Sequence, residues 1–71
     1  MRLDYDAATD SLYIHLSERE SVDSDEVADG VVLDFDQEGI LVGIDVQHAS
    51  TKADLARFSL RKLPLSQIDA A

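Results

Sequence analysis

The chain has 71 residues, and its fifteen acidic and six basic side chains give a formal net charge of -9. A chain of this length holds one domain and buries only about 60% of the surface that its unfolded form exposes, so disulfides, metals or oligomerisation often stabilise such domains. The chain has no cysteine, which excludes disulfides, thiolate metal sites and cysteine nucleophiles. Its negative charge argues against direct binding to nucleic acid or to anionic membranes, because their phosphates would be repelled.

No run of 18 or more apolar residues occurs, and the N-terminal MRLDYDAATD lacks a basic segment followed by an apolar one. We therefore expect a cytoplasmic protein with no membrane partner. After residue 51 the charge balance changes, since only two acids lie there with four of the six basic residues: Asp54, Asp69, Lys52, Arg57, Arg61 and Lys62. The acidic body is either a solvated surface that keeps a small domain soluble or a surface for a basic partner.

Apolar and polar residues alternate through residues 3–6 and again through residues 12–17, on either side of a turn at residues 7–10. A period of two is typical of strands, so this part of the chain predicts a β-hairpin. We expect Tyr5 and Tyr13 to pack across the hairpin as an aromatic pair.

Residues 20–28 are mostly polar, and Val22 and Val27 are their only large apolar members. The odd separation of these valines puts them on opposite faces of a regular strand, and a bulge near Asp25 would reconcile them. Charged side chains suit a strand at the edge of a sheet, where they discourage pairing with other chains. Asp29 and Gly30 then predict a tight turn, because Asp-Gly tolerates positive φ.

Alternation returns at residues 31–36 and 40–46 and predicts a second hairpin, with residues 37–39 as its turn and Gly39 at positive φ. Val32 and Leu41 lie out of phase with the main apolar stripe of this hairpin. Apolar side chains on both faces of a sheet require more than one covering layer. One short helix cannot supply both layers, so we expect a second subunit to supply one.

The turn of this hairpin raises the question of a metal site. The stretch DFDQEGILVGID begins at Asp34, places Asp45 twelfth, and nearly satisfies the pattern of a calcium-binding loop. Such loops lie between two amphipathic helices, whereas segments of period two flank this one. We interpret it as an acidic turn, and we keep a divalent-ion site at Asp34, Asp36 and Glu38 as an alternative.

The period changes after residue 46, where alanines and leucines at helical spacing predict a short helix over residues 48–58, capped by Ser50 or Thr51. Pro64 cannot lie inside a continuing helix, so residues 59–71 are expected to form an extended C-terminal arm. The predicted fold class is α+β: an antiparallel β-meander of four or five strands over residues 3–46, followed by the helix and the arm. This apolar arm is expected to lie over the sheet or against a second subunit.

The segments LDYDAATDSLYIHLS and EVADGVVLDFDQEGILVGIDVQHAS carry a resemblance to a known family. They resemble the small prokaryotic proteins of the domain of unknown function 2283 family, in a Tyr-Asp turn, a Leu-Tyr-Ile strand, a Gly-Val-Val-Leu-Asp strand and an acidic glycine turn. The resemblance covers residues 3–51, with Phe35 where the family usually has tyrosine and Asp45 where it usually has glutamate.

This resemblance implies an antiparallel meander followed by a helix, and it implies no established activity, cofactor or catalytic residue. Some members are encoded beside small toxin-like proteins, so the resemblance also suggests an antitoxin-like role. An acidic body would attract a basic toxin and mask the site at which that toxin binds phosphate.

The candidates for catalysis are few. His15 and His48 are the only histidines, and His15 is expected to be an ordinary strand residue. Asp45, His48 and Ser50 lie too close together in the sequence to form a triad, because triads assemble from separated parts of a fold with an oxyanion hole. We therefore predict no enzymatic activity and no cofactor.

Three functions stay open from the sequence. The leading one is a non-catalytic, homo-oligomeric protein-interaction module, and the others are an antitoxin-like partner of a basic protein and a divalent-metal-binding protein. For the leading function, the expected interface residues are Val32, Leu41, Phe58, Leu60, Leu63 and Leu65.

Overall fold

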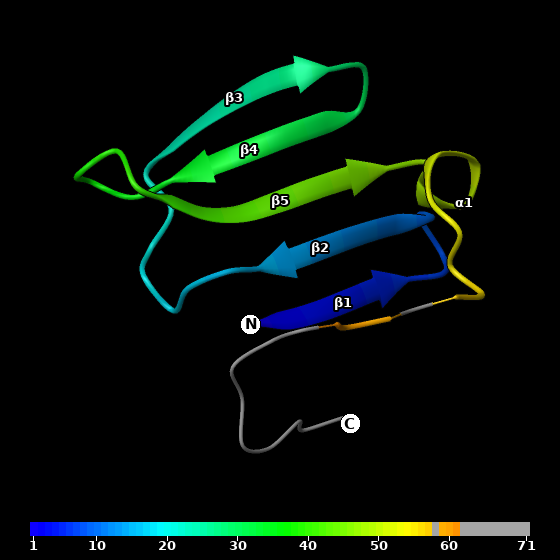
Figure 1. The fold of residues 1–71 in the computed structure, drawn as a ribbon. Helices are drawn as coiled ribbons and strands as arrows, with labels where there is room; N and C mark the ends of the chain where they lie inside the picture. Colours follow the sequence, from blue (N-terminus) through cyan, green and yellow to red (C-terminus); the bar gives the residue numbers. More distant parts are fainter. Residues whose placement is uncertain (58, 62–71) are drawn as a thin grey trace.

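The computed structural model describes residues 1–57 and 59–61. Within this range, five antiparallel strands form one sheet, and a single turn of helix follows them (Figure 1). The elements are β1 (Arg2–Asp6), β2 (Ser11–His15), β3 (Asp23–Ala28), β4 (Val31–Phe35), β5 (Leu41–Gln47) and α1 (Ala49–Lys52). The predicted combination of an antiparallel sheet and one short helix is confirmed. In the described part of the chain, no helix has the length and apolar character needed to span a membrane.

The order of the strands differs from a simple meander. It is β1-β2-β5-β4-β3, so β5 lies in the middle and pairs with both β2 and β4 (Figure 1). The connection from β2 to β3 therefore runs from beside the centre to the far edge. A physical reason lies in β5 itself, since it is the longest strand, contains two buried residues, and loses most contact with water in the central position.

The turns follow the predicted chemistry. Gly30 and Gly39 have φ values of 74° and 79°, as expected for the turns before β4 and after it. The strand β3 is an edge strand, as predicted, and its irregularity falls between Glu26 and Ala28 rather than near Asp25. The bulge leaves the Val27 side chain exposed, so it does not bring Val27 into the core.

The helix is shorter than predicted and begins differently. α1 ends at Lys52 because Ala53 is extended, with φ −134° and ψ 151°. The predicted cap by Ser50 or Thr51 is wrong, since the N-cap residue is His48, in the left-handed conformation and without a side-chain cap. The predicted arm, residues 59–71, lies largely outside the described residues, which include only 59–61 of it.

The strand register separates the side chains into two faces, because residues that lie opposite one another on paired strands share a face. One row joins Leu3, Ile14, Ile44 and Leu33 across four strands, and a second joins Tyr5, Leu12, Val46 and Val31. We call these eight residues the apolar face. The sheet therefore has one almost continuous hydrocarbon surface about four strands wide.

The opposite surface carries mainly polar side chains, and we call it the polar face. Across the five strands, its members are Arg2, Asp4, Tyr13, His15, Ser24, Glu26, Val32, Asp34, Gly43 and Asp45. Tyr13 belongs to this face, whereas Tyr5 lies opposite Leu12 on the apolar face. The predicted pairing of the two tyrosines is therefore wrong, because their side chains point to opposite faces of the sheet.

Candidate functional site

The apolar face is covered over only a small part of its area. Among the described residues, Val42 and Ala49 are the only buried hydrophobic side chains, and all eight residues of the apolar face are half-buried or exposed. Leu3 and Tyr5 remain 39% and 48% exposed, which is unusual for residues that lie next to aliphatic neighbours on a sheet. An uncovered apolar surface of this kind marks an interaction site.

The segment after α1 runs beside β1 and forms a groove with the apolar face. The groove has a volume of about 460 Å³ and is lined by Leu3, Tyr5, Leu12, Ala53, Asp54, Leu55 and Arg57. Leu55 is itself 42% exposed, so this segment adds apolar surface to the face and does not seal it. The groove extends the interaction surface past the edge of the sheet.

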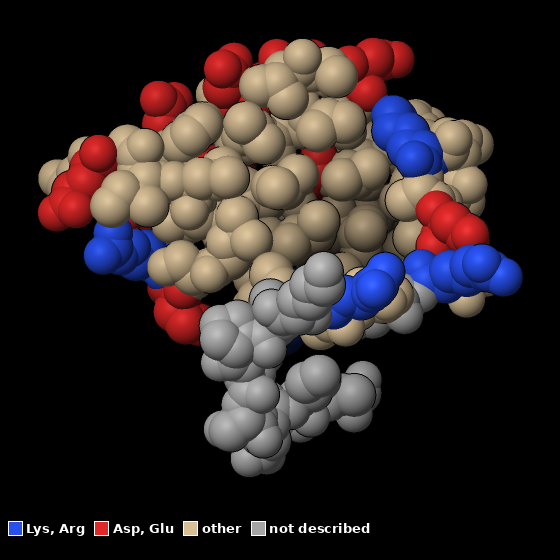
Figure 2. Space-filling model, viewed as in Figure 1, with Lys and Arg blue, Asp and Glu red and all other residues tan. Residues whose placement is uncertain are grey.

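Charges lie at the margins of the apolar face and leave its centre free. Figure 2 shows an uncharged centre, acidic side chains along the β3 edge, and both basic and acidic side chains toward α1 and at the opposite end of the strands. On β3, Asp25 lies opposite Leu33 and Asp23 lies opposite Phe35, so both carboxylates belong to the apolar side of the sheet. In the described part of the segment beyond α1, the basic residues are Arg57 and Arg61.

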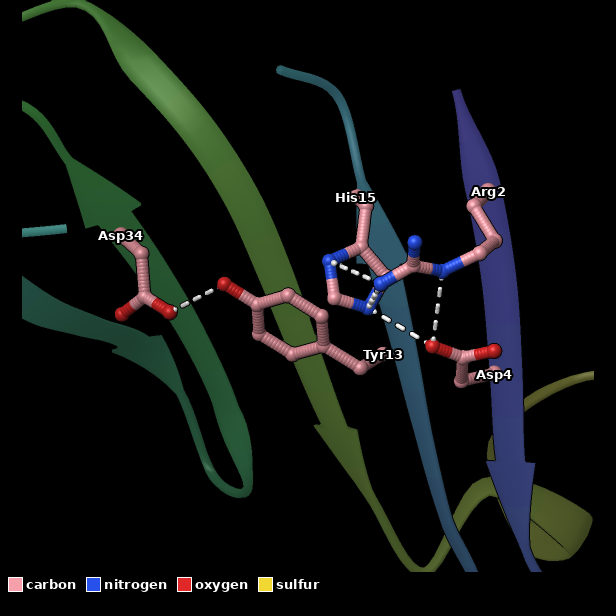
Figure 3. Close-up of polar contacts among 5 residues, drawn as sticks. All are labelled: Arg2, Asp4, Tyr13, His15 and Asp34. Carbon is pink, nitrogen blue, oxygen red and sulfur yellow. Dashed lines mark hydrogen bonds and ion pairs between the residues drawn. The ribbon is translucent and has the colours of Figure 1, made fainter. Parts of the chain in front are cut away.

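On the polar face, Tyr13 reaches across β5 to a carboxylate on β4. Its hydroxyl donates a hydrogen bond of 2.6 Å to Oδ2 of Asp34 (Figure 3). Ser24 donates one of 2.7 Å to the other oxygen. The ring passes over Gly43, where a Cβ atom would overlap the phenol oxygen and the ring carbons. Gly43 therefore has a steric role, since only a residue without a side chain lets Tyr13 span the central strand.

The Tyr13–Asp34 hydrogen bond predicts an unusual titration. Hydrogen bonding to the Asp34 carboxylate, followed by desolvation, raises the pKa of Tyr13 to about 12. Because this value lies above the pKa of 10 for unfolded tyrosine, the stabilisation is fully present below pH 10 and is lost as the pH rises toward 12. In a spectrophotometric titration, Asp34→Asn is expected to lower the pKa of Tyr13 toward 10. A Tyr13→Phe variant identifies which part of the absorbance change belongs to Tyr13. If Asp34→Asn leaves the pKa of Tyr13 unchanged, the hydrogen bond between the two side chains is contradicted.

Next to Tyr13, three polar residues form a surface cluster. Nε2 of His15 lies 2.8 Å from Oδ2 of Asp4, and Nε of Arg2 donates to the same oxygen at 3.1 Å (Figure 3). The ring of His15 also meets the ring of Tyr13 edge-on, with centroids 4.5 Å apart. The hydrogen bond from Arg2, ahead of the one from His15, lowers the pKa of Asp4. Such exposed pairs orient side chains and contribute little to stability.

The acidic turn uses its carboxylates within the fold. Oδ1 of Asp36 accepts hydrogen bonds of 2.9 Å from the backbone N–H groups of Glu38 and Ile40, and Arg19 donates to Oδ2 at 2.8 Å. The bond from Ile40, followed by that from Arg19, lowers the pKa of Asp36, which is only 7% exposed. Asp34 lies on the polar face and bonds elsewhere. The structure therefore does not bring the three candidate ligands together, and the described residues contain no cluster of three metal-ligating side chains.

Asp10 organises the start of α1 and was not identified from the sequence. Its backbone oxygen accepts the N–H of Ala49 at 2.9 Å, and its carboxylate accepts the Ser50 hydroxyl at 2.6 Å, the Ser50 N–H at 3.1 Å and the Tyr5 hydroxyl at 2.7 Å. The hydroxyl bond from Ser50, followed by that from Tyr5, lowers the pKa of Asp10. Ser50 is therefore engaged with Asp10, forty positions away, and not with His48.

The interface residues expected from the sequence lie in different places. Val32 belongs to the polar face, between Glu26 and Asp45, so its surroundings give no support to an apolar interface there. Leu41 is half-buried at the start of β5, opposite Phe35, and Leu60 is 36% exposed. The other three, Phe58, Leu63 and Leu65, lie outside the described residues.

The sequence of this sheet was compared with those of known proteins. The model of one protein family, described as "Protein of unknown function (DUF2283)", matches residues 2–50. The chain belongs to this family. The resemblance found from the sequence is therefore confirmed. No curated protein and no solved structure matches the chain.

The part of the chain that matches DUF2283 contains the whole sheet. It begins with β1 and ends at Ser50, inside α1. Both faces of the sheet, the Asp10 contacts and the acidic turn consequently lie within the family region, and the segment with Arg57 and Arg61 follows it. Membership in DUF2283 names no activity.

Proposed function

We propose that the protein is a non-catalytic, homo-oligomeric interaction module in which two copies pack the apolar faces of their sheets together. The observation that carries this proposal is the apolar face, which is built from four strands and remains uncovered among the described residues. A face of this composition gains free energy when another apolar surface removes it from water.

The helix is too small to cover this surface alone. α1 has four residues and is therefore only about 6 Å long, at about 1.5 Å per residue. Four strands at a spacing of about 4.8 Å, each with about five residues rising 3.4 Å, give a face of roughly 19 by 17 Å. Its side chains need a layer of similar extent, and a second sheet with the same face provides one.

The size of the face agrees with a specific dimer of modest affinity. Its projection is about 320 Å² per copy, and the relief of the side chains makes the accessible area larger. The area stays below the roughly 800 Å² per partner of a standard interface, as expected for a dimer of modest affinity. A chain with a net charge of −9 also repels its own copies, so the contact has to be apolar at its centre. The uncharged centre of the face meets this requirement (Figure 2).

Sedimentation equilibrium of the full chain at several concentrations tests this function. We expect a reversible dimer whose association weakens little, or strengthens, as salt rises, because apolar burial dominates and charge repulsion is screened. A mass that remains that of one chain up to millimolar concentration would overturn the proposal.

The acidic edge supports a second candidate function, an antitoxin-like contact with a basic protein. β3 is an edge strand whose six residues are all exposed, and it carries Asp23, Asp25 and Glu26. An exposed strand edge offers free backbone groups, and the carboxylates select a basic partner. Co-purification with the product of a neighbouring gene, lost in an Asp23→Lys and Asp25→Lys double variant, would support this function. A chain that purifies without a partner would count against it.

A further inference from the structure

We infer that the two copies are related by a two-fold axis parallel to β5, so that the acidic β3 margin of each copy faces the less acidic β1 margin of the other. This inference rests on the proposed face-to-face dimer and adds its orientation. It follows from the distribution of charge around the apolar face. It also places Asp25 of each copy near Arg57 of the other.

Symmetry leaves few choices for two identical sheets that pack face to face. The two-fold axis must lie in the plane between the sheets, and aligned sheets keep their strands within about 30° of one another. An axis along the strands places the β1 margin of one copy over the β3 margin of the other. An axis across the strands places every margin over its own counterpart.

The charges on the two margins distinguish these arrangements. On the β3 side, the register places Asp23 and Asp25 on the apolar side of the sheet. On the β1 side, Arg57 lines the groove together with Leu3 and Tyr5. An axis across the strands would bring Asp25 over Asp25 and Arg57 over Arg57, whereas an axis along the strands pairs opposite charges twice.

The margin beside β1 is less acidic than the β3 margin. Arg57 and Asp54 line the groove, and Arg61 follows in the same segment. Asp10 also lies nearby, but its carboxylate is engaged by the hydroxyls of Tyr5 and Ser50. Lys52 lies elsewhere, where its Nζ donates to the backbone oxygen of Gln47. Like charges that face each other across an interface are strongly unfavourable, whereas complementary margins fix the orientation of the partner. The along-strand arrangement is therefore the one that keeps the acidic β3 margins of the two copies apart and places each beside Arg57 of the other.

Charge reversal tests the orientation. In the full chain, Asp25→Lys and Arg57→Asp are each expected to weaken dimerisation by roughly tenfold at low salt, and the double variant is expected to return to within about threefold of wild type. Asp25→Lys is the sharper single change, because it lowers the net negative charge and would strengthen association if only overall repulsion mattered. High salt is expected to reduce all of these differences.

A matched control lies on the same strand. Glu26 is adjacent to Asp25 but belongs to the polar face, opposite Val32, so Glu26→Lys is expected not to weaken the dimer. A wild-type dimer that tolerates Asp25→Lys, or that the double variant fails to restore, would overturn the orientation and leave the proposed function intact. A wild-type chain that is monomeric would instead remove both. Circular dichroism of each variant confirms that it is folded.

Discussion

Val31→Lys is expected to turn the dimer into folded monomers, weakening self-association at least a hundredfold, which corresponds to about 2.7 kcal/mol. Val31 lies opposite Val46 and Ala28 on the apolar face. A lysine there would carry its ammonium group into the apolar contact, where no carboxylate of the same row can pair with it. Removing an unpaired charge from water costs several kcal/mol, more than an interface of modest size can supply.

The neighbouring residue supplies the control. Val32 has the same side chain on the same strand, but it lies on the polar face opposite Asp45 and Glu26, so Val32→Lys gains acidic neighbours and is expected to leave the dimer intact. Sedimentation velocity of both variants at matched concentration gives the comparison. If Val32→Lys dissociates the dimer and Val31→Lys does not, the interface lies on the polar face, and the proposed packing of the apolar faces is wrong.

Gly43→Ala is expected to lower the free energy of unfolding by about 1–3 kcal/mol, as over-packing of a closely packed site usually does. The new methyl group would overlap the hydroxyl and ring of Tyr13. The ring would have to leave its position over β5, which breaks its hydrogen bond to Asp34. Urea unfolding measures the loss of stability, and the titration of Tyr13 should move back toward pH 10 in the same variant.

Removal of Tyr13 should reverse the sign of this effect. In a Tyr13→Ala background the space above Gly43 is open, and alanine is favoured over glycine within a strand because it loses less backbone entropy on folding. Gly43→Ala is therefore expected to be neutral or stabilising in that background. An equal loss of stability with and without Tyr13 would show that the glycine is required for another reason.

Local patterns in the sequence predicted the strands and turns, whereas the order of the strands required long-range information. The period of two at residues 3–6, 12–17, 31–36 and 40–46 matches β1, β2, β4 and β5 closely, because alternation reports which side chains share a face. Alternation does not report which strand pairs with which. The insertion of β5 between β2 and β4 depends on the burial that each strand gains in the folded sheet.

Two side-chain contacts in the structure join residues that are far apart in the sequence. The Tyr13 hydroxyl donates a hydrogen bond to Asp34 across β5, and the Ser50 hydroxyl donates one to Asp10 at the start of α1. A signal for the first contact was present in Gly43, since a glycine inside a strongly apolar strand indicates a close approach by another group. Asp10 carried no comparable signal, because an aspartate in a hairpin turn already has a local explanation.

The assignment of faces depended on register in a similar way. Apolar side chains at Val32 and Leu41 suggested two surfaces in need of cover, and the register places Val32 among acidic neighbours instead. A single valine among polar groups needs no covering layer. The need for a partner therefore comes from one face alone, and it is the extent of that face that carries the proposal.

An isotope-filtered nuclear Overhauser experiment on a mixture of labelled and unlabelled full chains tests most directly whether a second copy covers the apolar face. We expect contacts between chains for the methyl groups of Ile14, Leu33 and Ile44, which form one row across the middle strands. A filtered spectrum without such contacts, in a sample where the same methyl groups contact residues 62–71 of their own chain, would contradict the face-to-face dimer.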